Sequence, residues 1–304
     1  MPFPLPTRED LLNPSRRHLF VFAHQDDEVL CAGLIQRVSS RGNSRFIWVT
    51  NGDGLAPEVG ADPGEYARLR EKECVEVLNR LGIRRDRAEF LGFSEIYLYD
   101  MIVEICQKSG KTPDALKFFR RMADDVGKSV SNASPDVVWT VAFQGGHPEH
   151  DLTHILTAKS LMKLGEKKGS RPPLVHFPEY EWTILIPARF RPGYSGKVYD
   201  IHLSEEEISG KRRVIEAYPS QTGLFAKFEK VINSLGKLAA IVGRRFTAED
   251  FLRREVFSPV PPDKDYIVCP QPLNALAYIA ERHKGVRVTF DRSIRPIIQD
   301  LFSS

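Results

Sequence analysis

The stretch VFAHQDDEVL, residues 21–30, decides how the rest of the chain is interpreted. The apolar run HLFVFA, residues 18–23, is rich in aromatic and β-branched residues and predicts a buried strand. One histidine and three acids follow directly, within residues 24–28. A strand that ends in so much charge needs an explanation. The simplest is the first turn of a helix, where acidic side chains favour the helix dipole.

Strand and helix patterns alternate on the C-terminal side of this stretch. Residues 28–42 have the apolar spacing of a helix, and the apolar run at 45–50 predicts a second strand, which together form a βαβ unit. The same reasoning predicts further helices over residues 65–82, 114–134 and 150–165, and further strands over residues 88–93, 135–143 and 173–181. We therefore predict an α/β fold, with a Rossmann-like, mostly parallel sheet flanked by helices.

The alternation weakens after about residue 185, and the C-terminal part is less regular. We predict an edge strand over residues 198–203, a helix over 205–221 and one more helix over 272–283. The last 45 residues contain several prolines and lack a clear period. We accordingly predict one domain over residues 1–258 and a C-terminal extension, residues 259–304, packed on it or beside it.

Composition limits the function classes. Of 304 residues, 42% are hydrophobic, which is enough for a large core, and the formal charge of +3 comes without a long basic run. We expect no nucleic-acid partner, no membrane span and no signal peptide, and hence a cytoplasmic protein. The four cysteines form no CxxC pair and are interpreted as reduced, structural thiols. The sequence leaves the oligomeric state open, with a homo-oligomer as one option.

A second polar cluster, HPEHD at residues 147–151, follows the predicted strand over 135–143. In open α/β sheets, ligands bind at the carboxyl ends of the strands, so the two clusters meet if their strands are neighbours. Taken alone, each cluster also fits an ordinary helix start, with Pro148 at the first position. Taken together, the acids would repel one another and lose solvation unless a cation lay among them. Two imidazoles and one carboxylate are a typical three-ligand zinc site.

Spacing alone leaves the ligand set open. Asp26 and Asp27 point about 100° apart at a helix start, so one can bind metal while the other faces the open site. His150 and His154 lie four residues apart and could imitate an HExxH pair. No Glu follows His150 directly, however, and we interpret His154 as a packed or supporting histidine.

The motifs in order resemble the PIG-L / LmbE-like family of zinc-dependent N-acetylglucosamine deacetylases. The matching segments are AHQDDE (23–28), VTNGDG (49–54), RLREKE (68–73), FLGFSE (90–95), GGHPEHDLTH (145–154) and KRRVIEAYPSQ (211–221). The resemblance extends from about residue 17 to about residue 258. Two positions depart from the family pattern, because Gln25 stands where Pro is usual and Glu149 stands where Asp is usual.

The resemblance implies a metal site made of His24, Asp27 and His150. These residues would hold one Zn²⁺ per chain, with room for Fe²⁺ or another divalent metal. Zinc lowers the pKa of bound water to about 7 and polarises a carbonyl, which is the chemistry that hydrolysis of an unreactive amide requires.

The resemblance also implies roles for residues around the metal. Asp26 would be the general base, and His147 would stand beside the developing oxyanion, oriented by Glu149. Arg70 and Glu95 would touch the sugar. The implied reaction is removal of the N-acetyl group from an N-acetylglucosamine-type sugar or glycoconjugate by a zinc-bound water molecule.

Three other interpretations remain open. A nucleotide-binding module would suit a Rossmann-like sheet, but the first strand–helix turn lacks GxGxxG and carries acids that would repel a pyrophosphate. A catalytically silent sugar-binding homologue would keep the fold without the reaction. A related zinc amidase would act on a non-acetyl acyl group or a thiol-sugar conjugate.

Overall fold

A computed structural model describes residues 5–108, 112–179, 188–191, 193–241 and 247–303 of the chain. Its centre is a seven-stranded sheet with the strand order β3-β2-β1-β4-β5-β7-β6. The strands are β1 (His18–Phe22), β2 (Ser44–Thr50), β3 (Ala88–Phe93), β4 (Val137–Val141), β5 (Leu174–Phe177), β6 (Tyr199–His202) and β7 (Arg254–Pro259). A separate short hairpin consists of β8 (Arg282–His283) and β9 (Val286–Arg287).

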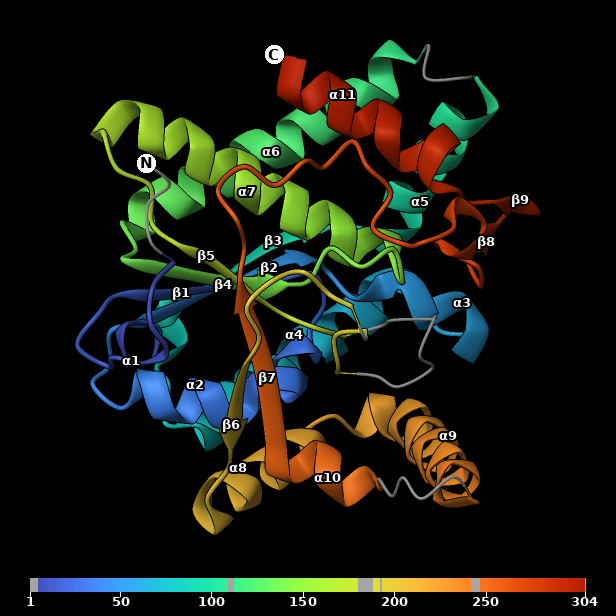
Figure 1. Cartoon of the computed structure of the whole chain (residues 1–304). Helices are drawn as coiled ribbons and strands as arrows, with labels where there is room; N and C mark the ends of the chain where they lie inside the picture. Colours follow the sequence, from blue (N-terminus) through green and yellow to red (C-terminus); the bar gives the residue numbers. More distant parts are fainter. Residues whose placement is uncertain (1–4, 109–111, 180–187, 192, 242–246, 304) are drawn as a thin grey trace.

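Helices cover both faces of this sheet (Figure 1). On one face lie α5 (Glu95–Gln107), α6 (Pro113–Ala133), α7 (Pro148–Lys168) and α11 (Arg295–Ser303). On the other face lie α2 (Ala32–Ser39), α4 (Pro63–Arg80) and α8 (Glu205–Glu216). Shorter or more peripheral helices are α1 (Arg8–Leu11), α3 (Ala56–Val59), α9 (Thr222–Ile241) and α10 (Ala248–Arg253). The predicted α/β fold with a mostly parallel sheet is confirmed.

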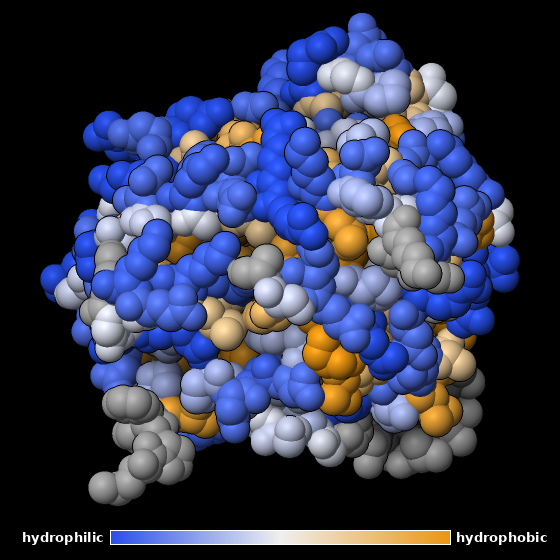
Figure 2. All heavy atoms as spheres, turned by 90° about the horizontal axis from the view of Figure 1, so that it is seen from above, coloured by the Kyte–Doolittle hydropathy of each residue, from blue (hydrophilic) through white to orange (hydrophobic). Residues whose placement is uncertain are grey.

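The centre of the sheet explains the apolar runs of the sequence. Every residue of β1 and β4 is buried, because helices cover both of their faces. Alternate side chains of β1 divide between two hydrophobic clusters: Leu19 and Val21 pack towards α6 and α7, and Phe20 and Phe22 pack towards α2. On the α11 and α6 side, the outer surface is largely hydrophilic (Figure 2).

β1 pairs in parallel with β2 on one side and with β4 on the other. β4 in turn pairs in parallel with β5. The carboxyl ends of β1, β4 and β5 therefore lie at the same edge of the sheet. This arrangement satisfies the condition under which the two polar clusters of the sequence should meet.

The last two strands of the sheet run against the others. β7 pairs antiparallel with both β5 and β6, so it leaves β6 as the edge strand. The edge position of β6 agrees with the prediction for residues 198–203. The strand β7 itself was not predicted, and it comes from a segment that follows α10 far along the sequence.

The predicted helix over residues 272–283 is wrong. The segment contains only a short 3₁₀ turn at Asn274–Leu276, further turns and the first strand of the hairpin. Tyr278 adopts a φ of +53°, its backbone N–H donates to Gly145 O, and its hydroxyl donates to Asp151. These contacts to a distant loop outweigh the local helical spacing.

The residues after β7 pack against the helices above the sheet. Phe290, Ile294 and Ile298 are fully buried in the same cluster as residues of α5, α6 and α7. The division of the chain at residue 258 stays a prediction. No helix in the described ranges has the length and apolar character needed to cross a lipid bilayer.

Candidate metal centre and surrounding cavity

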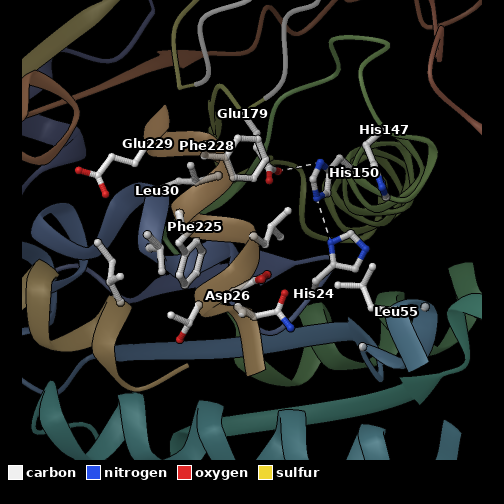
Figure 3. Close-up of a pocket in the computed structure, with 18 of the residues that line it drawn as sticks. His24, Asp26, Leu30, Leu55, His147, His150, Glu179, Phe225, Phe228 and Glu229 are labelled. Atoms are coloured by element: carbon white, nitrogen blue, oxygen red, sulfur yellow. Dashed lines mark hydrogen bonds and ion pairs between the residues drawn. The ribbon is translucent and has the colours of Figure 1, made fainter. Parts of the chain in front are cut away.

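The two polar clusters lie together at the carboxyl ends of β1 and β4. His24 lies two residues after the end of β1, and Asp27 begins a 3₁₀ turn, η1 (Asp27–Cys31), three residues after His24. His147 caps the N-terminus of α7, with Pro148 at its first position, and His150 follows in the first turn. Figure 3 shows His24 and His150 pointing towards each other at one end of a cavity.

Three donor atoms form a compact triangle there. His24 Nδ1 lies 3.0 Å from His150 Nε2 and 3.6 Å from Asp27 Oδ1, and the last two atoms are 3.3 Å apart. Tetrahedral ligands about 2.0–2.1 Å from a zinc ion lie roughly 3.3–3.4 Å from one another. The triangle therefore has the dimensions of one face of a tetrahedral zinc site, with a fourth position left over.

One other grouping of donors in the described residues fits less well. The donors of His24, Glu95 and Glu149 also lie within 4.8 Å of one another. Their closest approaches to His24 Nε2, however, are 3.8 Å for Glu95 and 4.0 Å for Glu149. These spacings exceed the tetrahedral edge, so Asp27 completes the better set.

Asp27 is held by the backbone that ends β1. One carboxylate oxygen, Oδ2, accepts hydrogen bonds from the N–H groups of Ala23 (2.7 Å) and His24 (3.0 Å), so Oδ1 faces the two imidazoles. Burial favours the neutral carboxyl, but His150 and His24 outweigh it and hold the pKa of Asp27 well below its usual range. Asp27 is therefore a fixed, ionised oxygen donor.

A carboxylate stands behind each of the three imidazoles. Glu179 Oε2 lies 2.7 Å from His150 Nδ1, Glu149 Oε2 lies 2.6 Å from His147 Nδ1, and Glu95 Oε1 lies 3.8 Å from His24 Nε2. Such partners fix the ring orientation and the tautomer of metal-binding histidines. Glu179 is within hydrogen-bond distance of His150 Nδ1 and leaves Nε2 for the triangle, whereas Glu95 acts on His24 Nε2 only as a nearby charge.

These carboxylates also set the charge of the rings. Burial lowers the pKa of His150, but Glu179 and Asp27 outweigh it and raise the pKa to about 10. Burial likewise lowers the pKa of His24, but Glu95 and Asp27 raise it well above its ordinary value. The surrounding carboxylates thus favour positive charge at this point, and a divalent cation would supply it.

Comparison with known proteins agrees with this arrangement. Residues 19–161 match the PIG-L family, described as GlcNAc-PI de-N-acetylase. This part of the chain is therefore similar to the PIG-L family. The matched residues include both polar clusters and all of the strands β1 to β4. A search of curated proteins by sequence found no significant match.

Solved structures resemble most of the chain. A deacetylase of teicoplanin biosynthesis has a TM-score of 0.54 and 17% identity, covering 82% of this chain and 100% of its own. N,N'-diacetylchitobiose deacetylase from Pyrococcus horikoshii has a TM-score of 0.52 and 18% identity, covering 83% of this chain and 88% of its own.

A third solved structure resembles the chain equally well. GalB, the 4-carboxy-2-hydroxymuconate hydratase from Pseudomonas putida, has a TM-score of 0.52 and 17% identity, covering 82% of this chain and 97% of its own. At these identities the three structures share the fold with this chain. A hydratase stands among them, so the reaction must be argued from the residues of the site.

Asp26 is separated from the triangle by its backbone conformation. Its φ of +126° is unusual for a residue other than glycine, and it turns the side chain away from that of Asp27. Asp26 lines the cavity, and its carboxylate lies 3.0 Å from Arg70 Nη2. Burial raises the pKa of Asp26 to about 7, against the opposing effect of Arg70. The two neighbouring acids thus occupy different environments.

Arg70 is anchored within the chain. Its guanidinium also donates to the backbone oxygen of Gln25 and to Ser220 Oγ, and it lies near Glu73. Glu73 in turn accepts hydrogen bonds from the N–H (2.8 Å) and hydroxyl (2.6 Å) of Ser220. The predicted Arg-x-x-Glu helix and the YPSQ segment therefore brace one another behind Asp26.

Glu95, the other residue expected at the sugar, also has partners within the chain. Its carboxylate accepts from Thr50 Oγ1 (2.9 Å) and from the backbone N–H of Gly54 (3.1 Å). A Cβ at position 54 would lie only 2.2 Å from that carboxylate, which explains the second glycine of NGDG. Both Arg70 and Glu95 line the cavity, and their contact with substrate stays a prediction.

Sequence reasoning missed two acids of the site, and both lie outside the matched residues. Glu179 follows β5, the neighbour of β4, so its place after a buried strand was the available signal. Glu281 lies in the irregular C-terminal segment, 3.8 Å from His147 Nε2, and accepts a hydrogen bond from Tyr99. No sequence pattern places Glu281 there, because its position depends on the loop that leads to β8.

His154 does not join the metal centre. It is fully buried, with Nδ1 2.8 Å from Val141 O and Nε2 3.0 Å from the hydroxyl of Tyr266. The interpretation of His154 as a packed histidine agrees with these contacts.

The metal centre opens into a cavity of about 1430 Å³. Its walls come from η1, α3, α5, α8, α9, α10 and the segment that includes β8. Most of these elements lie beyond residue 161, so much of the cavity is built outside the PIG-L match.

Proposed function

We propose that the chain is a metal-dependent hydrolase that removes the N-acetyl group from an N-acetylglucosamine-type sugar or glycoconjugate. The observation that carries the proposal is the triangle of His24 Nδ1, Asp27 Oδ1 and His150 Nε2, with edges of 3.0–3.6 Å. Its donor set of two imidazoles and one carboxylate suits Zn²⁺, and Fe²⁺ is the alternative ion. When bound there, the metal would polarise the acetyl carbonyl and acidify water.

Asp26 is proposed as the general base. It lines the cavity beside the triangle, and burial raises its pKa to about 7, where a carboxylate can both accept and return a proton. Arg70, 3.0 Å away, holds the carboxylate in one orientation. In this proposal Asp26 takes the proton of the attacking water and later delivers it to the departing amine.

His147 is proposed as the donor to the developing oxyanion. Glu149 holds Nδ1 at 2.6 Å, which directs Nε2 towards the cavity that both residues line. Burial lowers the pKa of His147, but Glu149 and Glu281 outweigh it and raise the pKa, which favours the protonated ring. Loss of one oxyanion donor typically costs a factor of about 10²–10³ in turnover.

The substrate-binding roles of Arg70 and Glu95 remain part of this proposal. The partner is proposed to be a small N-acetyl sugar or glycoconjugate, with no nucleic acid, in a cytoplasmic protein that can form a homo-oligomer. The sequence similarity of residues 19–161 to a GlcNAc-PI de-N-acetylase family supports an amide of an amino sugar as the substrate.

The test is deacetylation by the zinc-loaded protein across a panel of N-acetylhexosamines and their glycosides. We expect release of acetate and a free amine from at least one N-acetylglucosamine derivative, with loss of turnover in Asp26→Asn. Release only from a non-acetyl or thiol-sugar amide would favour the related amidase. Substrate binding without turnover would identify a silent homologue.

A further inference from the structure

The cavity has two unlike halves on either side of the metal centre. On one side, Glu95, Tyr99, Glu281 and His283 present polar groups from α5 and from the segment around β8. On the other side, the walls belong to η1, α8, α9 and α10 and are largely apolar. Figure 3 shows Leu30, Phe225 and Phe228 on this second side, away from His147.

The apolar half owes its character to one face of α9. Leu224, Phe225, Phe228 and Ile232 recur three or four residues apart and therefore share a face of the helix. All four line the cavity. Val231, on the same helix, does not line it and is 50% exposed.

The opposite wall continues the apolar surface. It includes Leu30 of η1, Ile215 of α8 and both Phe251 and Leu252 of α10. Together with α9, the segments η1, α8 and α10 enclose an apolar space. This space belongs to the same cavity as the metal centre. An apolar space of this kind gains free energy when a hydrocarbon replaces water.

The volume of the cavity indicates a large substrate. Ligand pockets commonly measure about 300–1,000 Å³, and this cavity measures about 1430 Å³. The proposed reaction removes an acetyl group, which contributes a single methyl. The apolar half must therefore serve another part of the substrate.

The charges around the apolar half favour an uncharged occupant. Among the described residues that line this half, the guanidinium belongs to Arg212, and it pairs with Glu249 at 2.6 Å. Glu216 and Glu229 add negative charge to the same walls. A phosphate group would meet repulsion there, whereas a neutral chain would contact the apolar side chains.

We propose that the apolar half binds an uncharged hydrocarbon aglycone attached to the amino sugar. The inference rests on the proposed function in one respect only, because it places the amide at the metal centre. It names the substrate class as a neutral, amphiphilic N-acetylglucosaminide.

The test compares methyl and octyl N-acetylglucosaminide by calorimetric binding to the zinc-loaded protein, with octyl glycoside below its micelle concentration. The octyl compound adds seven methylene groups, and we expect it to bind at least about 30-fold more tightly. Turnover is measured on the same two compounds, and we expect a similar preference in kcat/KM.

Two variants locate the effect. In Phe228→Ala, the ratio of octyl to methyl affinity should fall at least about 5-fold, because the aromatic wall is truncated. In Val231→Ala, on the same helix but outside the cavity, the ratio should equal that of the parent. A thermal melt of each variant checks that the substitution in α9 has not unfolded the protein.

Three results would overturn the proposal. The first is equal affinity for the methyl and octyl compounds. The second is tighter binding of N-acetylglucosamine 1-(octyl phosphate) than of the neutral octyl glycoside. The third is tighter binding of a methyl glycoside that carries an N-octanoyl group, which would place the hydrocarbon on the acyl side. Tight octyl binding without turnover would refute the deacetylase function and leave this proposal standing.

Discussion

Two groups of histidines lie close together in this molecule and are built differently. His24, His147 and His150 each face a carboxylate at 2.6–3.8 Å, and their pKa values are raised. His154 and His176 are also buried, but they contact tyrosine hydroxyls and, for His154, a backbone oxygen. Burial lowers the pKa of His154 to about 4 and that of His176 well below its ordinary value.

This difference indicates that the group next to one ring nitrogen determines the role of a buried imidazole. A carboxylate on one nitrogen increases the basicity of the other, which suits a metal ligand or a charged donor. Without a carboxylate partner, burial keeps the ring neutral, which suits packing. His150 and His154 share one helix and are one turn apart, yet they belong to opposite groups. The predictions below test this contrast.

The largest expected effect is loss of the metal. His150→Ala removes a corner of the donor triangle, so we expect zinc content to fall from one ion per chain to near zero and turnover to fall at least about 10³-fold. The matched control, His154→Gln, should keep its zinc. Metal analysis after gel filtration measures both, and one zinc per chain in folded His150→Ala would contradict the ligand assignment.

A smaller effect is expected for the general base. Asp26→Asn preserves the shape of the side chain, and Asn tolerates a positive φ better than most residues. Turnover should fall about 10²–10⁴-fold while zinc content stays at the parent level. Turnover in Asp26→Asn equal to that of the parent would refute the role of Asp26. Asp86→Asn, at an exposed position, provides the control.

The carboxylate behind His150 should have a measurable effect on metal affinity. In Glu179→Gln, the partner 2.7 Å from Nδ1 loses its charge, so we expect zinc affinity to fall about 10–100-fold. Competition with a chelator of known affinity measures this change. Glu206→Gln, an exposed carboxylate on α8, should leave the affinity unchanged. An unchanged affinity in Glu179→Gln would show that the ring is held by other contacts.

The smallest effect concerns the pH dependence of stability. His154 has a pKa of about 4 in the folded protein and about 6.5 when unfolded, so the unfolded chain takes up a proton first as the pH falls. Its contribution to stability is complete above about pH 6.5 and is lost towards pH 4. Between pH 8 and pH 6, the parent should lose about 1 kcal/mol more than His154→Gln. Denaturant unfolding of both proteins without metal measures the difference; equal losses would contradict the buried, neutral state.

Much of the fold could be predicted because its strands are buried on both faces. The runs at β1 and β4 contain almost only apolar residues, β2 contains the apolar run FIWV, and the helices between them carry clear apolar faces. β7 and the segment around Tyr278 could not be predicted in the same way. Their conformations depend on pairing with β5 and on contacts with Gly145 and Asp151, which are distant in sequence.

The residues of the site likewise divide into those that the sequence could predict and those that it could not. The meeting of the two polar clusters could be predicted because they follow two buried strands, and the sheet brings those strands together. The choice of His24, Asp27 and His150 as ligands came from the family resemblance. Glu179 gave only a weak signal, and Glu281 gave none, since a lone acid in an irregular segment has many ordinary explanations. The apolar face of α9 is visible in the sequence, but its position opposite Leu30 is not.

The most direct test of the metal centre is a crystal structure of the zinc-loaded protein with anomalous data at the zinc edge. We expect one ion per chain, bound by His24 Nδ1, Asp27 Oδ1 and His150 Nε2 at about 2.0–2.2 Å. An ion held instead by His24, Glu95 and Glu149, or imidazoles 24 and 150 too far apart to share one ion, would contradict it.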